Sequence, residues 1–416
     1  MAPTVRLRVG VLHVGRVPMK IRITTYSTVP RGDVVHAVSL AGALADRGHD
    51  VEVWALSHDG MPFLSEPRVP VQLIPLATDI EESVEARVER GTRALADALR
   101  AAPPVHVTHA VDPLTAQALL GLREEGRLPA VIRTIHHVDA FTDAALLEWQ
   151  RRSIVDVDVR ICVSRHWADR VDADFGVGCH VIPNGVESER FNTCEVTRAQ
   201  AGELFGWGTR PVVLAVGGIE ARKGSRLLLE AFARARGRLG DEAILVIAGG
   251  GALFDGQEYR EAWWRDADRL GLSVHDAAAG PAPVQANVII LGIVAEAQMP
   301  VLYRAADVLA FPSTREGFGM VVLEAMASGT PTVVADIPVL REHLTDDVDC
   351  VMVSAGDSGP LSNALVSVAR DEQLRRRLVT AGAATAARFT WSASAHAHED
   401  LYTRVLRDFG ELVRSR

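Results

Sequence analysis

One stretch, from residue 311 to residue 342, limits the fold more than any other part of the chain; it reads FPSTREGFGMVVLEAMASGTPTVVADIPVLRE. It starts at the end of an apolar run, breaks at Pro312-Ser313 and turns through Glu316-Gly317-Phe318-Gly319. A segment rich in Ala, Met and Leu follows and stops at Gly329, and the next apolar run, TPTVVAD, is typical of a buried strand. The order strand, Gly-rich turn, helix, strand predicts the βαβ unit of a parallel sheet.

The turn before this helix also predicts an anion site. Glycines let a bound group approach the backbone, and the first helix amides, which have no partner inside the helix, suit a diphosphate. The residues concerned are Gly317, Phe318, Gly319, Met320 and Val321. Glu316 and Glu324 flank this start, at a helical rise of roughly 12 Å. Since a carboxylate accepts hydrogen bonds from two neighbouring hydroxyls, the pair could hold a sugar at one end and a ribose at the other. The alternative is a solvated helix start whose glutamates only favour the dipole.

The complete string resembles the donor-site signature of retaining glycosyltransferases of family four, in the superfamily of glycogen synthase and the phosphatidylinositol mannosyltransferases. The resemblance rests on the EGFG turn, on Glu324 eight positions after Glu316, and on the continuation AMASG-x-P-x-V-x-x-D. It covers about residues 20 to 412 and implies the GT-B fold. That fold is α/β, with two Rossmann-like doubly wound parallel-sheet domains facing one cleft.

Length and composition agree with a two-domain globular protein. The chain has 416 residues, of which 48% are apolar and 23% charged. Its net charge of −9, with no basic stripe to offset it, argues against nucleic acid as a partner. The four cysteines show no metal-ligand spacing and fit thiols of a reducing cytoplasm: Cys162, Cys179, Cys194 and Cys350. No apolar run approaches the roughly 20 residues of a transmembrane helix, so a soluble, cytoplasmic protein is expected.

We expect the following division of the chain. Residues 1–18 are an N-terminal extension, either an added strand or a loose tail, and a low-periodicity linker runs from Asn192 to Arg210. The resemblance implies an acceptor domain at 19–200, a donor domain at 201–391, and a terminal helix at 392–416 that packs back on the acceptor domain.

Two places in the first domain are candidate site residues. Family members often have two adjacent glycines in the first loop, against the diphosphate or the acceptor, whereas this chain has Gly32-Asp33. Asp33 either meets an acceptor group or is an N-cap. The strand 130–135 ends in His136 and His137, where an open sheet presents its strand ends to a ligand. His137 and Asp139 are close enough in the chain to orient His136. A lone histidine there would be structural; the resemblance implies that His136 lies near the donor sugar at a switch-point strand.

In the second domain, Arg222 and Lys223 stand at a strand-to-helix turn beside glycines. The positive end of a helix disfavours cations, so two cations at this turn indicate a bound anion such as a diphosphate. Many family members have an arginine directly after the first glycine of the preceding loop, and here that position is Gly218. Lys223 matches the family directly, and Arg222 could replace the missing arginine. The resemblance further places Gly250 on the nucleotide side and Ile293 near the base.

The resemblance implies sugar transfer with retention from a nucleotide sugar to an acceptor that the sequence does not identify. The sequence has no acidic metal triad, and Lys223, Arg222 and the helix amides near Phe318 could stabilise the departing diphosphate, so no metal or other cofactor is expected. His136, Glu316 and Lys223 are the predicted catalytic residues. A UDP-sugar is the favoured donor, with GDP-mannose next, and the acceptor is a lipid, a polysaccharide or a small metabolite. Two alternatives stay open: a GT-B enzyme of another reaction, such as a nucleotide-sugar epimerase or a phosphorylase, and a nucleotide-sugar-binding regulatory protein that has lost turnover.

Overall fold

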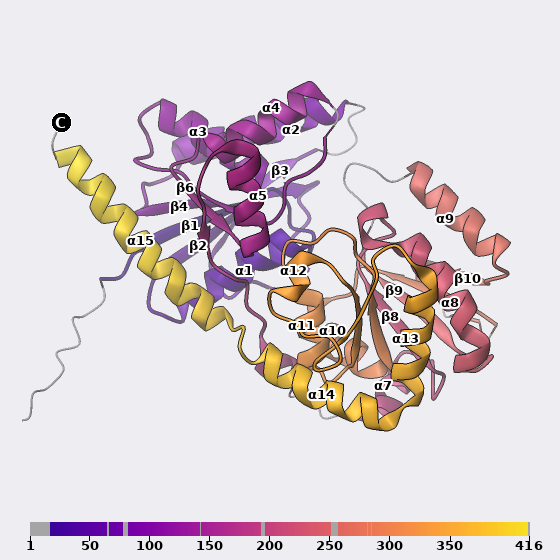
Figure 1. The fold of residues 1–416 in the computed structure, drawn as a ribbon. Coiled ribbons are helices and arrows are strands. Elements are labelled where there is room, and N and C mark those ends of the chain that lie inside the picture. The colour runs from indigo at the N-terminus through magenta and orange to yellow at the C-terminus, as the bar shows by residue number, and fades with distance from the viewer. Residues whose placement is uncertain are drawn as a thin grey trace, which may run out of the picture.

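The computed structural model describes residues 17–64, 66–77, 82–141, 143–192, 196–250, 257–280, 282–283 and 285–414. This part of the chain forms two seven-stranded sheets flanked by helices (Figure 1). Neighbouring strands run parallel in both sheets. The predicted α/β architecture is therefore confirmed. The predicted N-terminal extension lies, up to residue 16, outside the described residues.

The first sheet has the strand order β3-β2-β1-β4-β5-β6-β7. The chain adds strands on one side of β1 as far as β3 and on the other side from β4 onward, so the switch point lies between β1 and β4. Apolar side chains fill both of its faces. Its elements are β1 (Lys20–Thr25), α1 (Gly32–Ala45), β2 (Asp50–His58), β3 (Val71–Leu76), α2 (Val84–Ala101), β4 (Val107–Ala110), α3 (Pro113–Glu124), β5 (Ile132–Ile135), α4 (Ala144–Val155), β6 (Val159–Cys162), α5 (Arg165–Phe175) and β7 (His180–Val181).

The second sheet has the order β10-β11-β9-β8-β12-β13-β14 and reverses between β8 and β12. Ligands of open parallel sheets bind at such switch points, beyond the carboxyl ends of the strands. Its elements are α6 (Ser188–Asn192), α7 (Arg198–Leu204), β8 (Val212–Val216), η1 (Ala221–Lys223), α8 (Ser225–Leu239), β9 (Ile244–Ala248), α9 (Gln257–Arg269), β10 (Val274–Asp276), η2 (Ala277–Ala279), β11 (Val288–Gly292), η3 (Glu296–Gln298), α10 (Met299–Ala305), β12 (Val308–Phe311), α11 (Met320–Ala327), β13 (Thr332–Ala335), α12 (Pro338–Arg341), β14 (Val351–Val353), α13 (Ser358–Arg370) and α14 (Glu372–Ala386).

The last helix, α15 (Trp391–Arg414), returns to the first domain and lies along it in Figure 1. Leu401 and Tyr402 of this helix share a buried cluster with Ile21 of β1 and Leu40 of α1. The two chain crossings between the domains lie side by side, because Val186 and Thr390 form a parallel bridge. The described helices include none that is long and apolar enough to cross a membrane.

Two segments that show little apolar periodicity contain regular structure. The predicted linker contains helix α7, which begins with a capping box between Thr197 and Gln200. Further along, Val274–Asp276 form strand β10, which pairs with β11 at the sheet edge. In both places backbone hydrogen bonding organises a segment that has little apolar periodicity.

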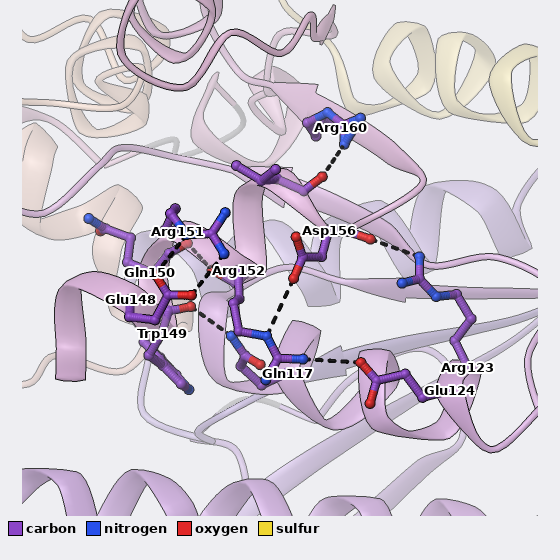
Figure 2. A network of polar contacts seen from close by, with 12 residues as sticks. Gln117, Arg123, Glu124, Glu148, Trp149, Gln150, Arg151, Arg152, Asp156 and Arg160 are labelled. Atoms are coloured by element: carbon purple, nitrogen blue, oxygen red, sulfur yellow. Dashed lines mark hydrogen bonds and ion pairs between the residues drawn. The ribbon is translucent and has the colours of Figure 1, made fainter.

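Polar contacts join the outer faces of α3 and α4 (Figure 2). Arg152 of α4 pairs with Glu124 of α3 at 3.1 Å and with Asp156 at 3.3 Å. Gln117 of α3 donates from Nε2 to the main-chain oxygen of Trp149 at 2.6 Å. These contacts hold α4 in the place from which it reaches the loop after β5.

Candidate active site

The donor-domain half of the site forms where β8 and β12 end. Lys223 Nζ lies 2.6 Å from Glu316 Oε1, and an Arg222 guanidinium nitrogen lies 3.7 Å from the same oxygen. Arg222 Nε also lies 2.9 Å from Glu220 Oε2. The two loops are tied together, since the Thr314 amide donates to the Arg222 carbonyl at 2.8 Å. Lys223 and Glu316, which are 93 positions apart in the chain, are thus brought together.

The charge of Glu316 follows from this geometry. Burial by itself raises the pKa of the Glu316 carboxyl, but the nearby charges of Lys223 and Arg222 and a hydrogen bond from Lys223 outweigh it. The net result is a lowered pKa, although the side chain is only 10% exposed. Glu316 is therefore an ionised acceptor of hydrogen bonds at neutral pH.

Helix α11 begins directly after this turn. Gly319 precedes it with φ of 91°, in the left-handed region, and no side chain caps the helix start within the described structure. The start of α11, with Met320 and Val321, therefore offers main-chain amides at the positive end of the helix. Glu324, four residues after the helix start at Met320, accepts a hydrogen bond from the Tyr303 hydroxyl at 2.7 Å, and burial raises the pKa of the Glu324 carboxyl.

Close packing of two glycine loops explains the absence of an arginine at position 218. A Cβ on Gly218 would lie 2.1 Å from the main-chain oxygen of Gly250. A larger residue would not fit without moving one of the loops. Arg222 approaches Glu316 from a different backbone position. Gly250 also faces Ile293, whose side chain would be 3.1 Å from an added Cβ, and Ile293 itself is 43% exposed.

The first domain contributes His136, which follows β5. This strand lies one position beyond the β1–β4 switch point, so the predicted location at a switch-point strand is wrong by one strand. Burial, followed by the charges of neighbouring histidines, holds the pKa of His136 well below its ordinary value. The two domains touch here, because a Cβ on Gly317 would lie 2.5 Å from the His136 carbonyl oxygen. A Cβ added to Gly32 would lie 3.8 Å from Met320 Cε of the donor domain, so Gly32 also faces that domain.

The residues after His136 are held by α4. Gln150 accepts from the Asp139 amide at 2.8 Å and donates to the Asp139 carbonyl at 3.0 Å. The Asp139 carboxylate in turn lies 3.3 Å from His137 Nε2. Asp33 is not the N-cap of α1, because Arg31 occupies that position. The Asp33 carboxylate instead accepts from the Val34 amide at 2.9 Å, and burial raises its pKa.

Sequence reasoning missed two residues next to the predicted site. The His36 ring centroid lies 4.9 Å from that of His136, and His36 Nδ1 lies 2.8 Å from the Asn184 side-chain oxygen. Trp167 Nε1 donates to the Glu316 carbonyl at 2.7 Å. No local signal identifies either contact, because their partners are far apart in the chain.

Known proteins are similar to both halves of the chain. The model "Glycosyl transferases group 1" matches residues 203–385, and the model "Glycosyltransferase Family 4" matches residues 30–190. The D-inositol 3-phosphate glycosyltransferase of Nocardia farcinica is 27% identical, over 94% of this chain and 91% of its own. The phosphatidyl-myo-inositol mannosyltransferase of Mycobacterium leprae is 28% identical, over 88% and 91%.

Solved structures share the fold. Sucrose-phosphate synthase from Thermosynechococcus elongatus superposes with a TM-score of 0.75, at 21% identity over 94% of this chain and all of that one. HepE of Anabaena, in complex with UDP and glucose, gives 0.72 at 19% identity, over 93% of this chain and all of that one. With both family models matched and the fold shared, the chain belongs to the family 4 glycosyltransferases of the GT-B fold and is a hexosyltransferase.

Proposed function

We propose that the enzyme transfers a sugar from a nucleotide-sugar donor to a hydroxyl acceptor with retention at the anomeric carbon. The observation that carries the proposal is the convergence of Lys223 and Arg222 on an ionised Glu316 beside the start of α11. In the reaction, the bond between the anomeric carbon and a diphosphate oxygen breaks. The acceptor oxygen takes its place, and the acceptor proton is released with the nucleoside diphosphate.

Each site residue receives a role from its position. Lys223, Arg222 and the amides of residues 318–321 bind the diphosphate and stabilise its growing negative charge, so we expect turnover without a metal. Glu316 holds donor sugar hydroxyls and Glu324 holds the ribose. Gly250 and Ile293 line the base, and Gly32 faces the diphosphate or the acceptor.

His136 acts by the anomeric carbon as a neutral imidazole. Its lowered pKa supports this role, because a neutral ring nitrogen can accept a hydrogen bond from a sugar hydroxyl. Replacing His136 by Phe should therefore lower turnover more than it lowers affinity for the nucleoside diphosphate, which lies on the other domain.

The donor and the acceptor are proposed from relatives. HepE was solved with UDP-glucose, which favours a UDP-sugar here. A relative in Mycolicibacterium smegmatis, 33% identical over half of this chain, is named as GDP-mannose-dependent, so GDP-mannose is second. Relatives named for inositol phosphate and phosphatidylinositol make these two compounds the first acceptors to test. The cytoplasmic location stays a prediction.

A thermal-shift panel tests the donor proposal. A ligand that binds only the folded state raises its stability, by about 2.7 kcal/mol at a hundredfold excess over Kd. UDP, GDP, ADP and their sugars are compared, and the best donor is then incubated with D-inositol 3-phosphate or phosphatidylinositol, with and without EDTA. The anomeric configuration of the product is read by NMR. If no nucleotide stabilises the protein, the proposed donor site is wrong.

A further inference from the structure

Helix α5 of the first domain meets the donor domain at its N-terminus. Glu342, directly after α12, accepts from the Arg165 amide at 2.8 Å and from the His166 amide at 2.6 Å. The next amide, that of Trp167, donates to the Ser164 hydroxyl at 3.4 Å. A carboxylate of the other domain thus satisfies two amides that a helix start leaves without partners, where negative charge is also favoured.

An apolar contact lies beside this polar one. Val339 of α12 is 2% exposed and belongs to a buried cluster that is otherwise built from the first domain, including Ile135, Ile154 and Val171. Trp167 belongs to the same cluster and is 7% exposed. The α5–α12 contact therefore has a buried apolar centre next to the carboxylate that caps α5.

Through this contact, Trp167 reaches the candidate active site. Its indole nitrogen donates to the main-chain oxygen of Glu316 at 2.7 Å. Within the donor domain, Lys223 holds the Glu316 carboxylate at 2.6 Å. Glu316 is consequently fixed from both domains, by its side chain in one and by its main chain in the other.

We propose that Trp167 is a positioning residue for Glu316, and that it acts only while Glu342 and Val339 dock α5 on the donor domain. The inference rests on the proposed role of Glu316 in holding the donor sugar. The diphosphate groups lie on Lys223, Arg222 and α11, which all belong to the donor domain and need no contribution from α5. Trp167 therefore controls the hold on the sugar part of the donor, and only when the two domains are in contact.

Trp167→Phe tests the positioning role, because it keeps an aromatic ring in the cluster and removes the N–H donor. Affinities for UDP and UDP-glucose, and for GDP and GDP-mannose, are measured by calorimetry beside the turnover of the preferred donor. We expect kcat to fall about two- to tenfold, the equivalent of one net hydrogen bond, with affinity for the nucleoside diphosphate within about twofold of wild type. Trp264→Phe, at an exposed position on α9, is the matched control and should keep wild-type kcat.

A purely structural role for Trp167 gives a different pattern. Loss of packing would lower the melting temperature and weaken nucleoside diphosphate and nucleotide sugar equally, with kcat at saturation unchanged. That pattern, or wild-type kinetics in Trp167→Phe, would overturn the proposal.

The docking of α5 is tested without any ligand. Hydrogen exchange is followed at the Arg165 and His166 amides in the ligand-free enzyme and in Glu342→Ala and Glu342→Gln. We expect exchange at these two amides to accelerate in the Ala variant and less so in the Gln variant, which keeps an acceptor oxygen. Equal rates in all three proteins would refute the docking. The exchange experiment needs no nucleotide, so it tests the docking of α5 even if the proposed function is wrong.

Discussion

A column of buried histidines predicts how stability depends on pH. The ring centroids of His36 and His398 lie 6.0 Å apart, those of His398 and His109 lie 5.7 Å apart, and His36 also contacts His136. His36, His109 and His398 have no exposed surface. Burial lowers the pKa of His36 to about 4. Burial first, and then the charges of neighbouring histidines, lowers the pKa of His109 well below its ordinary value and that of His398 to about 3.

The sign follows from proton uptake by the unfolded chain. Unfolded histidines bind protons below about pH 6.5, whereas these folded ones stay neutral until far lower pH, so acidification favours unfolding. Their contribution is complete above the unfolded pKa and is lost as the pH falls toward the folded values. When the pH falls from 7 to 5, a histidine such as His398 lowers the free energy of unfolding by about 2 kcal/mol. His36 and His398 together lower it by roughly 4 kcal/mol, a large share of the stability of about 5 to 15 kcal/mol typical of a domain.

The variant His398→Leu measures one of these contributions. His398 donates to the Ser394 carbonyl of its own helix at 2.8 Å, and its other ring nitrogen has no partner in the described structure, so an apolar side chain of similar size should fit. The free energy of unfolding is measured in urea at pH 7 and at pH 5. Its decrease between the two pH values should be about 2 kcal/mol smaller in the variant than in wild type. His396→Leu, at an exposed position on the same helix, controls for loss of an imidazole. Equal losses in wild type and His398→Leu would show that this histidine titrates alike in the folded and unfolded states.

Three substitutions in the active site give further predictions. Lys223→Ala should lower kcat by about a hundredfold or more at saturating donor, since it removes a cation from the departing diphosphate; unchanged turnover would remove Lys223 from the clamp. Gly317→Ala should lower kcat by about a hundredfold with little change in melting temperature, because the new Cβ would press on the His136 carbonyl of the other domain. Glu324→Gln should weaken binding of the nucleoside diphosphate about tenfold, and a 2′,3′-dideoxy nucleotide should bind wild type and variant equally.

The parts of the site that could be predicted are those encoded in short stretches of sequence. The turn at Glu316 and the basic turn at Lys223 each stand between a strand and a helix. Both strands end at the same edge of a parallel sheet, which brings the two turns together. Opposite charge then accounts for the distance of 2.6 Å between Lys223 Nζ and the Glu316 carboxylate. Helix α7 was also within reach, because Thr197 and Gln200 carry the spacing of a capping box.

Contacts between domains could not be predicted in the same way. Trp167 and Glu316 are 149 positions apart, and Arg165 and Glu342 are 177 apart, with no periodic pattern that relates them. The missing arginine at Gly218 is understood only once the backbone of Gly250 is seen against it. Such features depend on how two folded units pack, which single-sequence patterns do not encode.

A crystal structure with the nucleoside diphosphate that best stabilises the protein tests the central claim most directly. The proposed donor site predicts diphosphate oxygens about 3 Å from Lys223 Nζ, from the Arg222 guanidinium and from main-chain amides at the start of α11. A diphosphate bound elsewhere, with Lys223 still paired only to Glu316, would contradict it.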